Sequence, residues 1–328
     1  MKKATPVAFL SVITLLAGCS IDVTPKTTSS VTPSKEESTV VASSSQEVSV
    51  SSSQQESSSK ATSSASTSVD PEYVDPEKWT LNWSDEFDGT SLNKSYWEPQ
   101  IGDGSDYGVY QWGNSEQQYY KEENATVADG ALTITAKIEQ TGNYKYTSAR
   151  LRTKGKVFTK YGRIEAKMQL PAVRGCWPAF WMLPENNYMG QGWPYSGEID
   201  IMENKGRQSK ITSGALHYSD NGGHTYRTNT ATLSSSIQEW HVYALEWSSE
   251  EMRWFVDGKQ FLLARKEYWH PVGSVYPTDD DAPFNQDFHI LLNLAIGGHF
   301  DNYQLPPDNM LPASMKVDYV RIYKAVEK

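Results

Sequence analysis

Cysteine and histidine are scarce in this sequence, which has two cysteines and six histidines among its 328 residues. The histidines show no spacing typical of zinc ligands, which argues against a catalytic zinc ion. Net positive charge is also missing, because the chain carries a formal net charge of −10. An acidic chain is a poor partner for nucleic acid or anionic lipid, whereas an uncharged polysaccharide remains a suitable one.

Helical periodicity is absent as well, since no long stretch repeats its apolar residues every 3.6 positions. Strands are predicted instead, where apolar and polar residues alternate or where a short apolar run is bounded by turns: 131–138, 163–170, 252–256, 260–263, 288–296 and 316–323. The pair Asp257-Gly258 between two of them is typical of a type I′ hairpin. These patterns predict one all-β sandwich over residues 71–328.

The first 70 residues do not have the composition of a globular domain. Two lysines precede an apolar run, 4–17, which is too short to span a bilayer as a helix and has the form of a secretory signal peptide. Residues 20–69 contain no aromatic residue, and about half of them are Ser or Thr. Such a segment cannot bury enough apolar surface to offset its ordering entropy. We therefore expect a signal peptide at 1–18 and a disordered linker at 19–70.

The signal segment ends in Leu16-Ala17-Gly18-Cys19, which resembles the lipobox of bacterial lipoproteins. The resemblance implies cleavage before Cys19, which then carries lipid, and a secreted protein anchored only by this lipid to the outer face of the bacterial cell membrane. An unmodified thiol is the alternative. An acylated Cys19 cannot form a disulfide with Cys176, so the fold must depend on its own core. We expect Cys176 to be a small, packed apolar residue.

The segment Glu198-Ile199-Asp200-Ile201-Met202-Glu203 carries most of the chemical information. On a strand, its isoleucines point to one face and Glu198 and Asp200 to the other. Strict alternation would bury Glu203 with the isoleucines, where an unpaired carboxylate is costly. A β-bulge at Met202 would return Glu203 to the face of the other carboxylates. The segment thus predicts three carboxylates in a row on one exposed or cleft-lining face.

Carboxylates this close raise one another's proton affinity, so at least one should hold a proton at neutral pH. Retaining glycoside hydrolysis uses such a pair, one ionised to attack the anomeric carbon and one protonated to donate to the leaving oxygen, about 5–5.5 Å apart. The middle carboxylate, Asp200, can hydrogen-bond the attacking one. A solvated acidic strand face and a cation site are the alternatives.

Glu-Ile-Asp-Ile-Met-Glu resembles the signature of glycoside hydrolase family 16, in the bulged form typical of laminarinase-like members, which hydrolyse β-1,3-glucans. Other segments resemble the family in the same order: 114–120, 148–150, 161–165, 177–183, 214–218, 243–247 and 291–298. The resemblance covers 79–323. It implies a concave β-jelly-roll sandwich of the concanavalin A-like type.

The resemblance also implies roles for individual residues. Glu198 would be the nucleophile, Asp200 its assisting acid and Glu203 the general acid/base. Trp177 and Trp181 would stack on sugar rings, in a chain with 11 Trp and 19 Tyr, although core packing is the alternative for both. The remaining residues expected to bind substrate are Asn114, Arg150, His217 and His299.

No cofactor is implied for catalysis, but the resemblance implies one structural Ca²⁺. Its ligands would be Asp318 and the backbone carbonyls of Glu86 and Gly130, with a solvated strand residue as the alternative for Asp318.

Two positions depart from the family pattern. Gly297-Gly298-His299-Phe300 stands where the family usually has Gly-Gly-Asn-Trp, and Lys205 stands where many relatives have His. We expect a monomeric enzyme that hydrolyses β-1,3-glucan internally with retention of configuration. The alternatives are hydrolysis of mixed-linkage β-1,3-1,4-glucan or of a galactan, transglycosylation, and a non-catalytic glucan-binding lectin.

Overall fold

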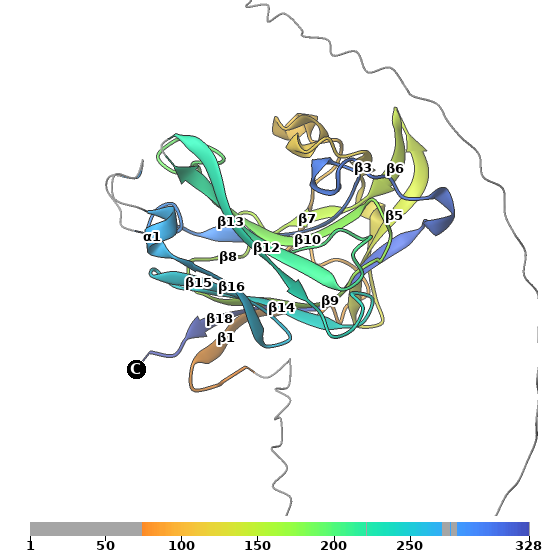
Figure 1. Cartoon of the computed structure of the whole chain (residues 1–328). Helices are drawn as coiled ribbons and strands as arrows, with labels where there is room; N and C mark the ends of the chain where they lie inside the picture. Colours follow the sequence, from red (N-terminus) through yellow and green to blue (C-terminus); the bar gives the residue numbers. More distant parts are fainter. Residues whose placement is uncertain (1–73, 221, 271–275, 277–280, 328) are drawn as a thin grey trace, which may run out of the picture. The chain divides into compact units, whose positions relative to one another are not determined.

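The computed structural model describes residues 74–220, 222–270, 276 and 281–327, and in this part of the chain the strands form two stacked sheets (Figure 1). One sheet has ten strands: β1 (Trp79–Asp85), β3 (Gln118–Tyr120), β4 (Ala125–Ala128), β5 (Ala131–Thr141), β6 (Tyr144–Ser148), β9 (Gly162–Gln169), β14 (His241–Trp247), β15 (Glu251–Val256), β16 (Lys259–Arg265) and β18 (Ala313–Ala325). The other has eight: β2 (Glu98–Pro99), β7 (Arg150–Arg152), β8 (Phe158–Thr159), β10 (Cys176–Pro184), β11 (Glu198–Glu203), β12 (Ile211–Asp220), β13 (Gly223–Thr232) and β17 (Phe288–Ile296).

Helices are short and lie in the connections: η1 (Ser105–Tyr107), η2 (Tyr110–Gly113), η3 (Glu122–Asn124), α1 (Lys266–Trp269), η4 (His299–Asp301) and η5 (Asp308–Met310). Among the described residues, no helix has the length and apolar character needed to cross a membrane. The predicted all-β sandwich is confirmed.

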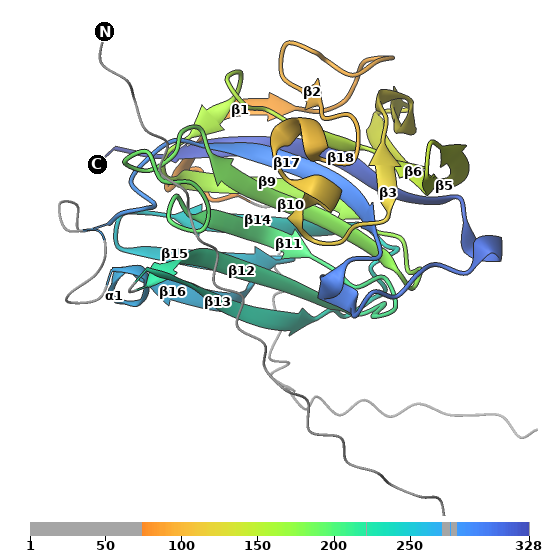
Figure 2. The same ribbon diagram turned by 90° about the horizontal axis from the view of Figure 1, so that it is seen from above.

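The strand order brings distant parts of the sequence together. The ten-stranded sheet runs β16-β15-β14-β9-β18-β5-β6-β3, with β1 beside β18 and β4 beside β5. The eight-stranded sheet runs β13-β12-β11-β10-β17-β7-β2, with β8 beside β17, and Figure 2 shows its central strands side by side. Each predicted strand falls largely within an observed one, because the alternation of apolar and polar residues follows the pleat.

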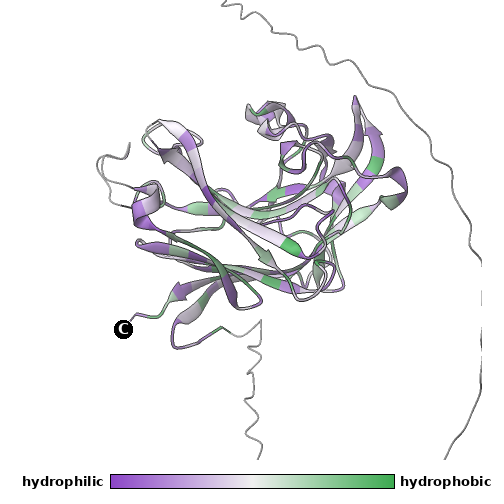
Figure 3. Cartoon of the chain, in the orientation of Figure 1, coloured by the Kyte–Doolittle hydropathy of each residue, from purple (hydrophilic) through white to green (hydrophobic). Residues whose placement is uncertain are grey.

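The core lies between the two sheets and is built from the inward-facing residues of both. Strand β17 is buried at all nine positions, as predicted for a central strand. Its Leu292 and Leu294 join the core, whereas Asn293 is buried on the opposite face of the sheet. In Figure 3 the strands mix hydrophobic and hydrophilic colours, whereas the connecting loops are mostly hydrophilic.

Two local predictions are also confirmed. Asp257 and Gly258 both have positive φ, of 47° and 70°, as a type I′ hairpin requires. Cys176 is fully buried, and this burial raises the pKa of its thiol to about 12, so it packs as an apolar residue. The predicted signal peptide at 1–18, the linker at 19–70 and the lipidation site Cys19 lie outside the described residues.

Candidate active site

Strand β11 contains the predicted bulge. Between Asp200 and Glu203 it has one residue more than the stretch of β12 with which it pairs. Ile201 and Met202 are both fully buried in the core, so the irregularity involves both residues and not Met202 alone. Glu203 consequently returns to the face that carries Glu198 and Asp200, as the sequence predicted.

A tryptophan from the opposite sheet supports the centre of this row. Trp254 of β15 is fully buried, and its indole Nε1 donates a hydrogen bond to the backbone oxygen of Asp200 at 2.8 Å. Gly214 of β12 makes room for the indole, since a Cβ there would lie 2.6 Å from Trp254 Cδ1. The support is non-local, so nothing in the sequence around residue 200 indicated it.

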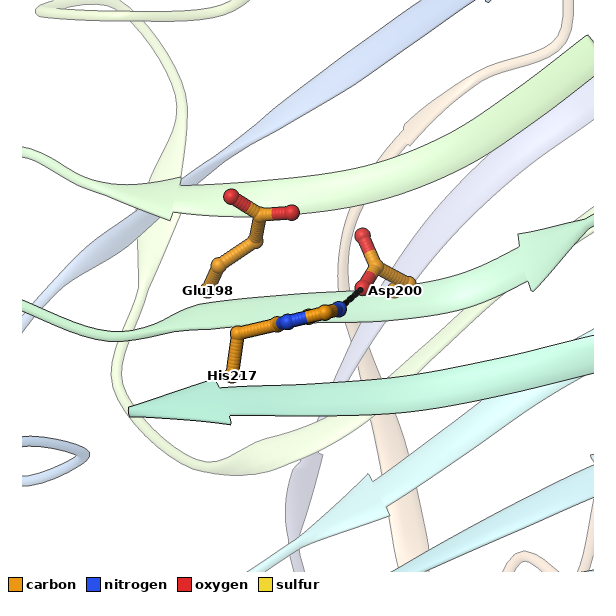
Figure 4. A group of neighbouring side chains, drawn as sticks. All are labelled: Glu198, Asp200 and His217. Atoms are coloured by element: carbon orange, nitrogen blue, oxygen red, sulfur yellow. Dashed lines mark ion pairs between the residues drawn. The ribbon is translucent and has the colours of Figure 1, made fainter. Parts of the chain in front are cut away.

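His217 of β12 lies opposite Glu198 in the strand pairing. Its Nε2 is 3.1 Å from Asp200 Oδ2, and Figure 4 shows the imidazole reaching along the strand to that carboxylate. Glu198, Asp200 and His217 each offer an atom within 4.8 Å of the other two, a geometry in which a cation could bind. Contact with His217 also gives Asp200 a partner without an ion.

Burial dominates the electrostatics of the three carboxylates. It raises the pKa of Asp200 to about 7 and that of Glu203 to about 8. Burial, followed by the charge of Asp200, raises the pKa of Glu198 well above its usual range, while His217 and Arg150 act in the opposite direction. The carboxylates titrate as a coupled group, and that group holds at least one proton at neutral pH.

Glu203 is held from one side by a stack of side chains. Trp177 Nε1 donates a hydrogen bond to Glu203 Oε1 at 3.0 Å, and the indole stacks on Phe300 with ring centroids 4.8 Å apart. Lys205 Nζ lies 4.6 Å from the centroid of the Phe300 ring, and its charge lowers the pKa of Glu203. The two departures from the family pattern, at Lys205 and Phe300, therefore meet in one cluster behind Glu203.

This stack bears on the prediction that Trp177 stacks on a sugar ring. Only 8% of Trp177 is exposed, so most of its ring surface supports Glu203 and Phe300 and little is free for a sugar. His299 is exposed, and its ring centroid lies 6.3 Å from that of Trp177. The contact of His299 with substrate stays a prediction.

Arg150 is buried between two tryptophans, which the sequence did not indicate. Its guanidinium carbon lies 4.5 Å from the ring centroid of Trp112 and 4.7 Å from that of Trp181. Its Nε donates a hydrogen bond to Gln100 Oε1 at 2.7 Å. The charge of Arg150 thus has a fixed position beside Glu198, and its burial shows that Arg150 is not a plain surface cation. Trp181 is half-buried and can still offer ring surface to a sugar.

Asn114 is fixed by a buried carboxylate that the sequence analysis did not single out. Its Nδ2 donates to Glu116 Oε1 at 3.2 Å. Glu116 is 2% exposed and also accepts hydrogen bonds from Gln118 and Tyr120. The alternate spacing of Glu116 and Gln118 was the available signal, because these residues lead into strand β3, whereas Asn114 lies in the turn that follows η2.

One of the predicted calcium ligands, Asp318, has another partner. Asp318 Oδ2 lies 3.0 Å from Lys167 Nζ, so a lysine already supplies the positive charge that a calcium ion would supply. The side chain of Glu86 accepts two hydrogen bonds from Arg321, at 2.9 and 2.8 Å. The predicted ligand from Glu86 is its backbone carbonyl, which these side-chain bonds do not involve, so the calcium ion stays a prediction.

The family model described as "Beta-porphyranase A-D, GH16 domain" matches residues 79–325. A protein named Beta-glucanase from Rhodothermus marinus is 41% identical over 261 residues, which cover 76% of this chain and 86% of that protein. Glucan endo-1,3-beta-glucosidase A1 from Niallia circulans is 36% identical over 279 residues, which cover 80% of this chain but only 40% of that longer protein.

Solved structures agree with the sandwich fold. The laminarinase catalytic domain from Thermotoga maritima MSB8 superposes with a TM-score of 0.68 at 36% identity, covering 76% of this chain and 100% of that domain. The two-sheet sandwich of the described residues is therefore the jelly roll that the sequence resemblance implied.

Proposed function

Because the chain belongs to glycoside hydrolase family 16, we propose that it hydrolyses internal β-1,3 bonds of a laminarin-type glucan with retention of anomeric configuration. The observation that carries this proposal is the row of carboxylates on β11, in which Asp200 is buried between the half-buried Glu198 and Glu203 and which holds at least one proton at neutral pH. Relatives and solved structures named as β-1,3-glucanases or laminarinases support the choice of glucan.

In the first step, the Glu198 carboxylate attacks the anomeric carbon while Glu203 donates its proton to the glycosidic oxygen. The bond between that carbon and that oxygen breaks, and an ester joins the sugar to Glu198. In the second step, Glu203, now ionised, takes a proton from water. The resulting hydroxide equivalent attacks the anomeric carbon, which frees Glu198 and retains the configuration.

The surroundings of the two glutamates suit these roles. Burial and the charge of Asp200 raise the pKa of Glu198 well above its usual range, and His217 and Arg150 act against this rise, toward the ionised form that a nucleophile needs. The assignment of Glu198 as the nucleophile therefore rests on the family resemblance and not on its pKa. Glu203 has a pKa of about 8, so it is protonated at neutral pH and can act as an acid. Asp200 lies between them, and a hydrogen bond with Glu198 lowers the pKa of Asp200.

A second candidate substrate has one specific observation in its favour, which is that the matching family model is described as a β-porphyranase. His299 and Phe300 depart from the usual family pattern beside the site, which is where a change in sugar preference would arise. Porphyran and agarose therefore belong among the substrates tested, together with mixed-linkage glucan.

Product analysis tests the proposed function. The purified protein and its Glu198→Gln variant would be incubated with laminarin, barley mixed-linkage glucan, porphyran and agarose, and the released oligosaccharides would be separated by size. Short β-1,3-linked products from laminarin, absent with the variant, are expected. Products from porphyran alone, or from mixed-linkage glucan alone, would contradict the proposed laminarin-type substrate. Binding without cleavage would favour a lectin.

We also propose that Cys19 carries the lipid that holds the monomeric enzyme at the outer face of the cell membrane. The support is the lipobox-like sequence together with the Ser- and Thr-rich segment that follows it. Metabolic labelling with a radioactive fatty acid should mark the wild-type protein and not the Cys19→Ala variant. Equal labelling of the two proteins would contradict the anchor.

A further inference from the structure

A second group of aromatic side chains lies beside the carboxylate row, on the opposite side from Trp177 and Arg150. Strands β12 and β13 flank β11 on one side, whereas β10 and β7 lie on the other. Tyr226 of β13 pairs with His217 of β12, and His217 pairs with Glu198 of β11. The three side chains therefore form a line across neighbouring strands on one face of the sheet.

The rings of this group are in contact with one another. His217 and His224 stack with ring centroids 5.1 Å apart, and His217 Nδ1 lies 2.9 Å from His224 Nε2. The Tyr226 ring lies 5.6 Å from that of His217, and the Trp193 ring lies 4.7 Å from that of His224. Since His217 Nε2 also contacts Asp200, the aromatic group continues directly from the carboxylates.

Two of these rings are unusually open to solvent for their size. Trp193 is 53% exposed and Tyr226 is 58% exposed. Single exposed aromatic residues are common, but these two belong to one contiguous patch that begins at the carboxylates. A pyranose ring has an apolar C–H face that packs on such uncharged rings, and the ring nitrogen of His224 can hydrogen-bond a hydroxyl group.

The position of the patch indicates its occupant. An enzyme that cuts within a polymer must accommodate sugar units on both sides of the bond that breaks. The half-buried Trp181 of β10 lies on one side of the row, and β12 and β13 form the other. Resting on the proposed function, we infer that Trp193, His224 and Tyr226 form a sugar-binding surface for the glucan chain on the β13 side of the carboxylates.

The expected consequence is a dependence on chain length. Units bound at Trp193 and Tyr226 lie away from the bond that breaks, so they add affinity for long chains and leave the chemical step unchanged. Loss of one ring should raise KM for laminarin by about two- to tenfold with little change in kcat. Hydrolysis of laminaritriose, which is too short to fill both sides of the row, should change less.

The test uses Trp193→Ala, Tyr226→Ala and Tyr226→Phe in the full chain, with kcat and KM measured on laminarin and laminaritriose. Tyr226→Phe keeps the ring and should behave as the wild type. Trp240→Ala is the matched control, because Trp240 is a 37% exposed tryptophan beside Lys167 of the other sheet and should leave both constants unchanged.

Three results would contradict the proposed sugar-binding surface. One is an unchanged KM for laminarin in both alanine variants. Another is an equal fall in kcat on both substrates, which would mean that the rings only position His217. The third is a wild-type protein that does not cut laminarin, which would overturn the proposed function itself, whereas the first two would leave that function standing.

Discussion

Replacing Asp200 by asparagine removes a carboxylate that is 3% exposed while keeping nearly the same shape. Burial raises the pKa of Asp200 from 3.8 to about 7 in the folded protein. A group whose pKa is raised on folding stabilises the protein fully below its unfolded pKa, and this contribution is lost as pH rises through the folded pKa. The wild-type protein should therefore lose stability between about pH 4 and pH 7.

The size of this loss follows from the interval between the two pKa values. About three pKa units at 1.36 kcal/mol each correspond to roughly 4 kcal/mol. Loss of the contact with His217 offsets about 1 kcal/mol of the gain in the variant. At pH 8, Asp200→Asn should be more stable than the wild type by about 2–3 kcal/mol, and at pH 4 it should be equal or slightly less stable.

Urea unfolding at pH 4 and pH 8 measures both differences. Asp308→Asn is the control, because Asp308 is an exposed carboxylate paired with Lys145 and its replacement should not change the pH dependence. The Asp200→Asn variant also tests the electrostatics of catalysis, since the charge of Asp200 raises the pKa of Glu203. The alkaline limb of kcat/KM should move to lower pH. If the stability of Asp200→Asn fell with pH as steeply as that of the wild type, burial of Asp200 would not be the cause of the pH dependence.

Two other substitutions probe separate parts of the site. Trp177→Phe keeps the stack on Phe300 but removes the hydrogen bond that lowers the pKa of Glu203. The alkaline limb of the pH–rate profile should therefore move to higher pH. An unchanged limb would contradict that role of the indole. Gly214→Ala places a Cβ 2.6 Å from Trp254, so calorimetry should show a loss of about 1–3 kcal/mol, whereas unchanged melting would contradict the tight packing.

Local patterns predicted the strands and the carboxylate row because their information lies within a few residues. The bulge could be inferred because a buried Glu203 was energetically unacceptable, and Ile201 and Met202 do both enter the core. The Asp-Gly hairpin needed only the preference of its two residues for positive φ.

The remaining features depend on which strands become neighbours, which alternation does not encode. Trp254 comes from the other sheet to hold Asp200, and Arg150 is enclosed by tryptophans at positions 112 and 181. Lys205 and Phe300 are nearly a hundred positions apart, yet they meet behind Glu203. Motif spacing therefore indicated the row of carboxylates, while the strand order determines how their protons are held.

The stereochemistry of the first product shows whether the enzyme acts by double displacement. Proton NMR of a fresh laminarin digest, recorded before mutarotation, reports which anomer the purified protein releases first. We expect the β-anomer, which requires a double displacement through Glu198. Initial release of the α-anomer, or no new reducing ends from laminarin, would contradict it.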